Sequence, residues 1–259
     1  MKFLLILALA ASAFAQQSPA SPNPQPTQDA NARQARQILD QCIKALGGHA
    51  YLSIRDLKQT GRGYGFHNNA STGVGIVFTR YYQYPGKERT ELLKDWTIIH
   101  TGDQGFETTF RGTTVEDPKA LAIYVRRRSY ALDFVLRDWL QQPGTALFYD
   151  GPTITETKEV HKVTLINSKN AAVSLYISAK NFLPVKKTFT YRDPDDNELS
   201  EESEIYDNYR PIQGIMTPFN LTRTRNGEMN SQRFLRDVTY NSGLPDALFT
   251  PPPLHRLKK

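Results

Sequence analysis

From Thr145 to Tyr240 the chain is a succession of short strand-like runs separated by turn residues. Runs with alternating apolar and polar residues are typical of antiparallel hairpins. The clearest turn is Asn226-Gly227, because this dipeptide readily adopts the backbone of a two-residue hairpin turn. The paired runs are "HKVTLIN" and "AAVSLYIS", "VKKTFTY" and "ELSEESEIYDNY", and "IMTPFNLTRT" and "MNSQRFLRDVTY". The sequence therefore predicts an antiparallel sheet whose strands follow one another along the chain.

Two more hairpins are predicted before Thr145. The run that starts at Val74 is followed by Pro85-Gly86 and the returning run "KERTELL", and "WTIIHTGDQGFETTF" repeats the arrangement. Alternate residues of a strand share one face. We therefore expect three sets of residues to point into the concave side of the sheet: Ile76, Phe78, Tyr82 and Tyr84; Val173, Leu175 and Ile177; and Phe219 and Leu221.

Two segments have helical periodicity instead. The first covers residues 29–46 and ends at Gly47-Gly48, and its apolar stripe includes Cys42, which we interpret as a buried structural thiol. The second runs from Pro118 to Gln142 after a capping Asp117. This segment is apolar on two sides, which is typical of a helix buried on both. The residues expected to face a cavity from its second side are Ile123, Tyr130 and Phe134.

The predicted fold is mainly β, of the α+β type. A sheet with one apolar face must cover that face, and two helices are few for so many strands. A curved, incomplete antiparallel barrel with an N-terminal helix and a central plug helix satisfies both conditions. No linker is evident inside residues 29–259, so we predict a single domain there. The single cysteine excludes an internal disulfide.

The N-terminus has the pattern of a secretory signal peptide. Lys2 precedes an apolar stretch and an Ala13-Phe14-Ala15 cleavage box, so residues 1–15 are expected to be removed by cleavage after Ala15. The Pro, Ser and Gln residues of 16–28 predict a disordered linker. The apolar stretch is too short to span a bilayer, so the mature protein is predicted to be periplasmic or secreted and not membrane-spanning.

Charge and motifs argue against several classes of function. The formal net charge is +6, a mild excess, and an exported protein of this kind is not expected to bind nucleic acid. The chain contains no nucleophile elbow, Walker loop or His-Glu-x-x-His motif, and its five histidines have no ligand spacing. We therefore predict a protein that is not an enzyme, with no catalytic residues, no metal and no cofactor.

Two stretches resemble ligand-binding loops only in part. "GRGYGF" at residues 61–66 has the glycines of a phosphate loop, but no helix pattern follows it, which favours a twisted strand. Asp193, Asp195, Asn197 and Glu204 match four positions of a calcium loop. However, Glu198 stands where that loop needs glycine, which favours a solvated hairpin loop.

Four motifs, taken in order, resemble the LolA-like family of outer-membrane lipoprotein carriers and its wider superfamily. They are the helix after the signal peptide, "YYQYPGKERTEL", "IIHTGDQGFETTF" and "DALFTPPP". The resemblance implies an incomplete antiparallel barrel whose apolar concave face is plugged by helices and shields acyl chains. The family's carriers have an arginine directly before the proline of the second strand's turn, where this chain has Tyr84.

The resulting hypothesis is an exported carrier or sensor that binds the acyl chains of a lipid or lipoprotein in an apolar cavity. Burial of an acyl chain contributes roughly 0.8 kcal/mol per methylene, so a dry groove suffices without catalytic groups. The alternative is a module that docks a protein partner in the cell envelope through the same curved sheet. The twelve residues named above as facing the concave side or the cavity are the expected ligand contacts.

Overall fold

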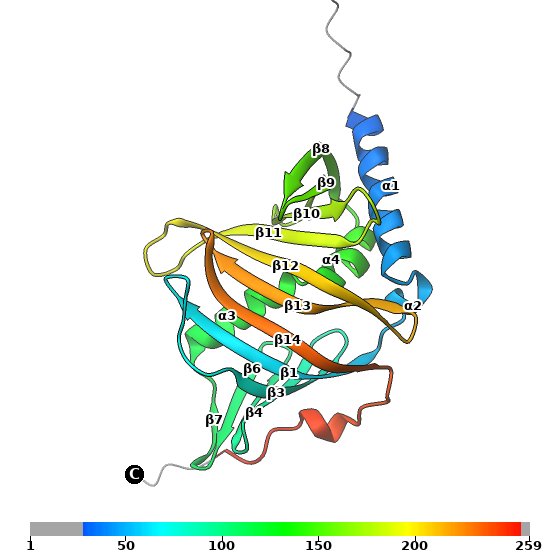
Figure 1. Cartoon of the computed structure of the whole chain (residues 1–259). Coiled ribbons are helices and arrows are strands. Elements are labelled where there is room, and N and C mark those ends of the chain that lie inside the picture. The colour runs from blue at the N-terminus through cyan, green and yellow to red at the C-terminus, as the bar shows by residue number, and fades with distance from the viewer. Residues whose placement is uncertain (1–27, 255–259) are drawn as a thin grey trace, which may run out of the picture.

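The computed structural model describes residues 28–254 (Figure 1). The predicted signal peptide, its cleavage site after Ala15 and the predicted linker lie outside this range, apart from Gln28. Gln28 is the first residue of α1 (Gln28–Leu46), which the short α2 (His49–Leu52) follows. The first helix therefore begins one residue before the predicted start and ends where predicted, at Gly47 and Gly48, which both have positive φ.

Fourteen strands form one sheet, in the order β7-β6-β5-β4-β3-β1-β14-β13-β12-β11-β10-β9-β8, with β2 paired to β1 beside this path. Every pair of neighbours is antiparallel, and β7 and β8 at the two ends do not pair with each other. The strands are β1 (Asp56–His67), β2 (Ala70–Ser71), β3 (Ile76–Gln83), β4 (Lys87–Leu92), β5 (Trp96–Thr101), β6 (Gln104–Thr109), β7 (Gly112–Val115), β8 (Ala146–Thr155), β9 (Lys158–Ile166), β10 (Ala172–Ser178), β11 (Pro184–Arg192), β12 (Leu199–Ile212), β13 (Ile215–Arg225) and β14 (Glu228–Tyr240).

The predicted hairpins are confirmed. The turn between β13 and β14 places Asn226 at φ 50° and Gly227 at φ 82°, both in the left-handed region that a two-residue hairpin turn requires. The glycine-rich stretch at residues 61–66 lies inside β1, as the strand interpretation predicted. β1 pairs with both β3 and β14, so the early and late hairpins join in one open, curved sheet. The predicted fold class, an incomplete antiparallel barrel with an N-terminal and a central helix, is confirmed.

The central helical segment is not one continuous helix. It consists of α3 (Pro118–Ser129), α4 (Leu132–Arg137) and the 3-10 turn η1 (Trp139–Gln141). As predicted, Asp117 caps α3, accepting hydrogen bonds from the amides of Lys119 and Ala120. The expectation of a helix buried on both sides was wrong for α3, which contains no buried residue. Ala131 has extended backbone angles, which ends one helix and starts the next.

The hydrophobic core lies at one end of the concave face. There α1 and α4 pack on β9 and β10, and Figure 1 shows α1 beside this end of the sheet. Cys42 is fully buried in this core, as predicted, and burial raises the pKa of its thiol. Almost completely buried residues of this core include Leu39, Leu46, Val135, Leu136, Trp139, Val163, Leu165, Val173, Leu175 and Ile177.

The last described segment packs against the other end of the sheet. It contains the 3-10 turn η2 (Asp246–Phe249), in which Phe249 is buried, and Leu254 forms a bridge with Thr113 of β7. The "DALFTPPP" motif therefore contacts strands β4 and β5, and Leu254 directly after it contacts β7. Within residues 28–254, no helix combines the length and apolar character needed to cross a membrane.

Candidate functional site

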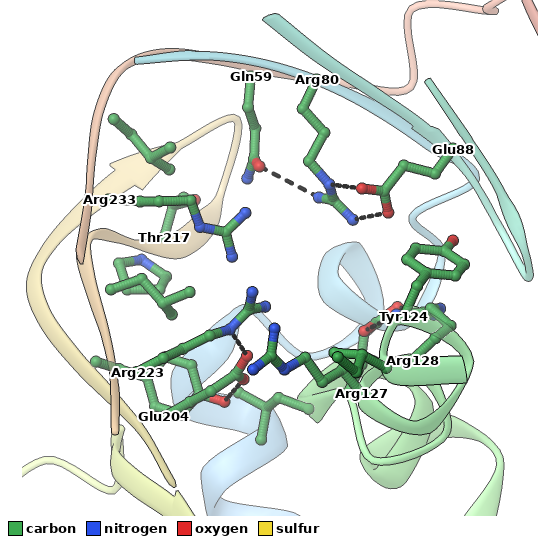
Figure 2. A pocket seen from close by; sticks show the side chains of 18 of the residues that line it. Gln59, Arg80, Glu88, Tyr124, Arg127, Arg128, Glu204, Thr217, Arg223 and Arg233 are labelled. Atoms are coloured by element: carbon green, nitrogen blue, oxygen red, sulfur yellow. Dashed lines mark hydrogen bonds and ion pairs between the residues drawn. The ribbon is translucent and has the colours of Figure 1, made fainter. Parts of the chain in front are cut away.

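A cavity of about 490 Å³ lies between α3, the start of α4 and the concave face of the sheet (Figure 2). Its size is within the usual range of small-molecule sites. The sheet contributes residues from β1, β3, β4, β12, β13 and β14. The residues that line the cavity are Gln59, Arg80, Glu88, Ala120, Ile123, Tyr124, Arg127, Arg128, Ala131, Leu132, Asp133, Glu204, Tyr206, Thr217, Pro218, Leu221, Arg223, Arg233, Leu235 and Tyr240.

Apolar side chains form part of the cavity wall on both the helix side and the sheet side. Ile123 projects from α3 and Leu132 from α4, while Leu221 and Leu235 project from β13 and β14. Ile123 lines the cavity and is still 37% exposed. This wall can receive an apolar ligand segment.

The rest of the wall is largely charged, again on both sides. Five arginines and three carboxylates line the cavity, so its lining carries two more positive than negative charges. On β3, the guanidinium of Arg80 donates to both oxygens of Glu88 at 2.9 and 2.7 Å. Burial alone would raise the pKa of Glu88, but the Arg80 guanidinium outweighs burial and lowers it to about 2. Glu88 is therefore ionised and its charge is compensated by Arg80.

A second ion cluster centres on Glu204 of β12. Its carboxylate accepts hydrogen bonds from Lys187, Arg223 and Tyr206, each at 2.8 Å. Lys187 is 1% exposed, and its ammonium also donates to the carbonyl of Tyr130 at 2.6 Å. Burial opposes the charge on Glu204, but Lys187 and Arg223 outweigh it and hold the pKa of Glu204 well below its usual value. This cluster fixes the position of the Arg223 side chain at the cavity edge.

The helix side adds two more paired arginines. Arg127 of α3 donates through Nε to Glu202 of β12 at 2.7 Å, which ties the helix to the sheet. Arg128 donates to both oxygens of Asp133 at 2.8 and 2.7 Å and also to the hydroxyl of Tyr82. Three consecutive arginines on a helix would by default form a solvated face, but Arg126, Arg127 and Arg128 hold α3 against the sheet.

Arg233 of β14 differs from the other four arginines of the lining. Its guanidinium points into the cavity (Figure 2), and it forms no hydrogen bond or ion pair with any side chain in residues 28–254. Burial, together with the nearby charges of Arg223 and Arg80, lowers its pKa to about 9. Arg233 is thus still protonated at pH 7, and its charge is not compensated by a contacting carboxylate.

The structure brings two of the twelve expected ligand contacts to the cavity, Ile123 and Leu221. Phe78 and Tyr82 are buried on β3, and Tyr130 stacks on Phe189 with ring centroids 4.1 Å apart. Neither these three residues nor the next five line the cavity. Val173, Leu175, Ile177 and Phe219 belong to the closed hydrophobic core, and Phe134 packs against it.

The remaining two expected contacts lie on or just after β3. Ile76, the first residue of β3, is only partly buried and does not line the cavity. Tyr84 follows the last residue of β3, and its hydroxyl donates to Asp138. The guanidinium of Arg137 lies 3.6 Å from the centroid of the Tyr84 ring. At the position where the family's carriers have an arginine, Tyr84 therefore links the end of β3 to the C-terminal end of α4.

Sequence reasoning missed the charged half of the lining. Arg80 lies within the alternation of Ile76, Phe78 and Tyr82 on β3. Arg223 continues the alternation of Phe219 and Leu221. Arg233 lies two residues before Leu235 and therefore shares a strand face with it. The available signal was therefore a set of arginines at inward-facing strand positions. Such residues are rarely buried without a partner.

Comparisons with known proteins support the fold. A scan against protein-family models and a search of curated proteins gave no match. Among solved structures, a DUF1329 family protein from Desulfovibrio piger aligns with a TM-score of 0.58 at 11% identity, over 83% of this chain and 97% of the other.

Two further solved structures are similar over most of the chain. A putative outer membrane lipoprotein-sorting protein domain from Vibrio parahaemolyticus aligns with a TM-score of 0.56 at 12% identity, over 85% of this chain and 97% of its own. A LolA superfamily protein from Nitrosomonas europaea aligns with a TM-score of 0.51 at 14% identity, over 83% and 97%. At these identities the likeness concerns the fold, so the chain has the fold of the LolA superfamily.

Proposed function

We propose that this protein is an exported carrier or sensor that shields the acyl part of a lipid or lipoprotein in the cavity beneath α3. The observation that supports this most directly is the open cavity of about 490 Å³ with an apolar wall on the concave face. A carrier needs such a space, and it does not need catalytic groups, because burial of methylenes supplies the binding free energy. The LolA-superfamily fold and the signal-peptide pattern support the same function.

The proposed contacts with the acyl part are the apolar residues that line the cavity. Ile123 and Leu221 were expected from the sequence, and Leu132 and Leu235 join them in the structure. Helix α3 is the element suited to move when a ligand enters, because none of its residues is buried. Its attachments to the sheet include the ion pairs of Arg126 and Arg127 with Glu202, the contacts of Arg128, and the stacking of Tyr124 on His100 of β5.

Two apolar residues of α3 provide a matched test. Ile123 lines the cavity and is 37% exposed, whereas Val125 is 40% exposed and does not line it. Titration with the neutral fluorescent probe N-phenyl-1-naphthylamine should show binding to the wild type. Ile123→Asp should weaken this binding at least tenfold, and Val125→Asp should change it less than twofold.

Native mass spectrometry of protein purified from its own host provides an independent test. Bound acyl chains would support the carrier, and a stoichiometric protein partner without lipid would favour the envelope docking module instead. If the wild type binds neither the probe nor any lipid, or if Ile123→Asp and Val125→Asp behave alike, the proposed function is wrong.

A further inference from the structure

The uncompensated charge of Arg233 requires an explanation. Charged groups inside proteins are normally paired, because removal from water costs more than most single contacts return. The other four arginines of the lining each contact a carboxylate, but Arg233 contacts none within residues 28–254. Like charges on Arg223 and Arg80 lie close enough to disfavour its protonated form. The protein therefore maintains a positive charge in the cavity that its own described side chains do not neutralise.

Arg127 and Arg223 have unused donors beside it. Each contacts its glutamate through Nε alone, Arg127 with Glu202 at 2.7 Å and Arg223 with Glu204 at 2.8 Å. Their terminal Nη groups make no hydrogen bonds with residues 28–254. Figure 2 shows the guanidinium groups of Arg127, Arg223 and Arg233 directed toward the same space from α3, β13 and β14. Three forked donors thus converge on one space, and the Glu204 carboxylate beside it accepts from Nε of Arg223 but from none of the three terminal Nη groups.

Strand register explains this convergence. Arg233 is opposite Leu221 in the β13–β14 pair, and Arg223 is two residues further along β13, so both arginines lie on the concave face at neighbouring positions. On its other side Arg233 is opposite Gly63 of β1, which has no side chain to fill the space. A Cβ atom at Gly63 would lie 3.8 Å from the Cγ of Arg233. Gly63 therefore places no side chain beside Arg233, and even a methyl group there would only contact it.

We infer that the cavity binds an amphiphile by its anionic group, a carboxylate or a phosphate, on Arg127, Arg223 and Arg233. This inference rests on the proposed function, because the acyl part of the same ligand would lie along the apolar wall of Ile123, Leu132 and Leu235. Guanidinium groups suit this role, since their planar forks match the oxygens of carboxylates and phosphates. The bound anion would supply the negative charge that the cavity lining lacks.

The test compares ligands that share one alkyl chain and differ in the head group. Isothermal titration calorimetry would measure the binding of laurate, dodecyl phosphate and dodecanol, each below its aggregation limit. Inorganic phosphate would be titrated separately as a fourth ligand. We expect at least one of the two anionic amphiphiles to bind tenfold or more tightly than dodecanol, and the stronger of them identifies the head group. Inorganic phosphate should bind at least tenfold more weakly than that ligand.

The variants isolate the guanidinium. Arg233→Met should weaken binding of the preferred anion at least fivefold, change dodecanol binding less than twofold and leave the melting temperature equal or higher. The matched control is Arg236→Met, also on β14, whose side chain is 77% exposed. It should leave all affinities unchanged.

The outcomes separate the two proposals. If dodecanol binds as tightly as both anions, or if Arg233→Met weakens dodecanol equally, the anionic head group is excluded while the acyl carrier stands. If inorganic phosphate binds as tightly as dodecyl phosphate, the site takes a free anion and the amphiphile is excluded. If none of the four ligands binds, both proposals fail.

Discussion

Beneath α1 and α4, strands β9 and β10 present side chains that are almost completely buried, among them Val163, Leu175 and Ile177 at 0% exposure. Beneath α3, strands β13 and β14 present Leu221, Arg223 and Arg233 on the same concave face, and there a cavity remains. The two regions follow the same alternation and the same antiparallel pairing. The difference between them is the covering element: a helix pair with a continuous apolar stripe at one end, and a helix held by ion pairs at the other.

This difference separates stability from binding within one sheet face. The packed region is built from apolar side chains, so its contribution is hydrophobic burial. In the region beneath α3, paired charges hold the helix in place. The cavity there exposes apolar surface, and Arg233 has no side-chain partner among the described residues. Substitutions should therefore have opposite consequences in the two regions.

The largest contrast is expected from introducing a carboxylate at two inward-facing leucines. Leu175→Asp places an unpaired charge in the closed core and should cost more than about 4 kcal/mol, enough to unfold a protein of ordinary stability. Leu221→Asp places the carboxylate opposite Arg233 in β14, so it should cost less than about 1 kcal/mol. Urea denaturation followed by circular dichroism measures both. Equal destabilisation would show that the two regions do not differ in packing.

The central helical segment offers the next contrast. Trp139 is 2% exposed and lies in the core, so Trp139→Ala should cost about 3–5 kcal/mol of unfolding free energy. Phe134 is only partly buried at the edge of that core, so Phe134→Ala should cost about half as much. Thermal and urea unfolding would measure both losses. Similar large losses would mean that the packed region extends to the cavity edge.

The Arg80–Glu88 pair should make the region beneath α3 sensitive to acid. The pKa of Glu88 is about 2 in the folded protein and near 4.5 when unperturbed, so the unfolded state binds the proton first as pH falls. The stabilisation is complete above pH 4.5 and is lost as pH falls toward 2, with a size on the order of 3 kcal/mol. Urea denaturation between pH 2 and 6 should show a smaller pH dependence for Glu88→Gln than for the wild type. An exposed control, Glu228→Gln, should match the wild type.

The smallest effect is expected at the far end of α3. Lys119 and Asp195 form an ion pair at 2.8 Å, but both side chains are largely exposed. Solvent and salt screen such a pair, so Lys119→Ala should leave the unfolding curve within experimental error of the wild type. A clear loss of stability would show that the N-terminal end of α3 is held at this contact rather than by the arginines near its C-terminal end.

Local rules in the sequence determined the elements of this protein. The Asn226-Gly227 turn, the Asp117 cap and the glycines after α1 depend on backbone geometry within a few residues, so each could be predicted and each is confirmed. Two-residue alternation likewise placed Leu175 and Leu221 on strand faces that turn inward. The order of the motifs led to the LolA-like fold that the solved structures share.

Only the tertiary structure decided which inward-facing residues pack and which line a cavity. Alternation gives the face of a strand, but it does not say which helix covers that face or how closely. Strand register and the break at Ala131 bring Arg127, Arg223 and Arg233 together from three elements that are up to about a hundred residues apart in the chain. The sequence determined which face of a strand each side chain occupies. The site depends on pairing between strands that are distant in the chain, which no local pattern predicts.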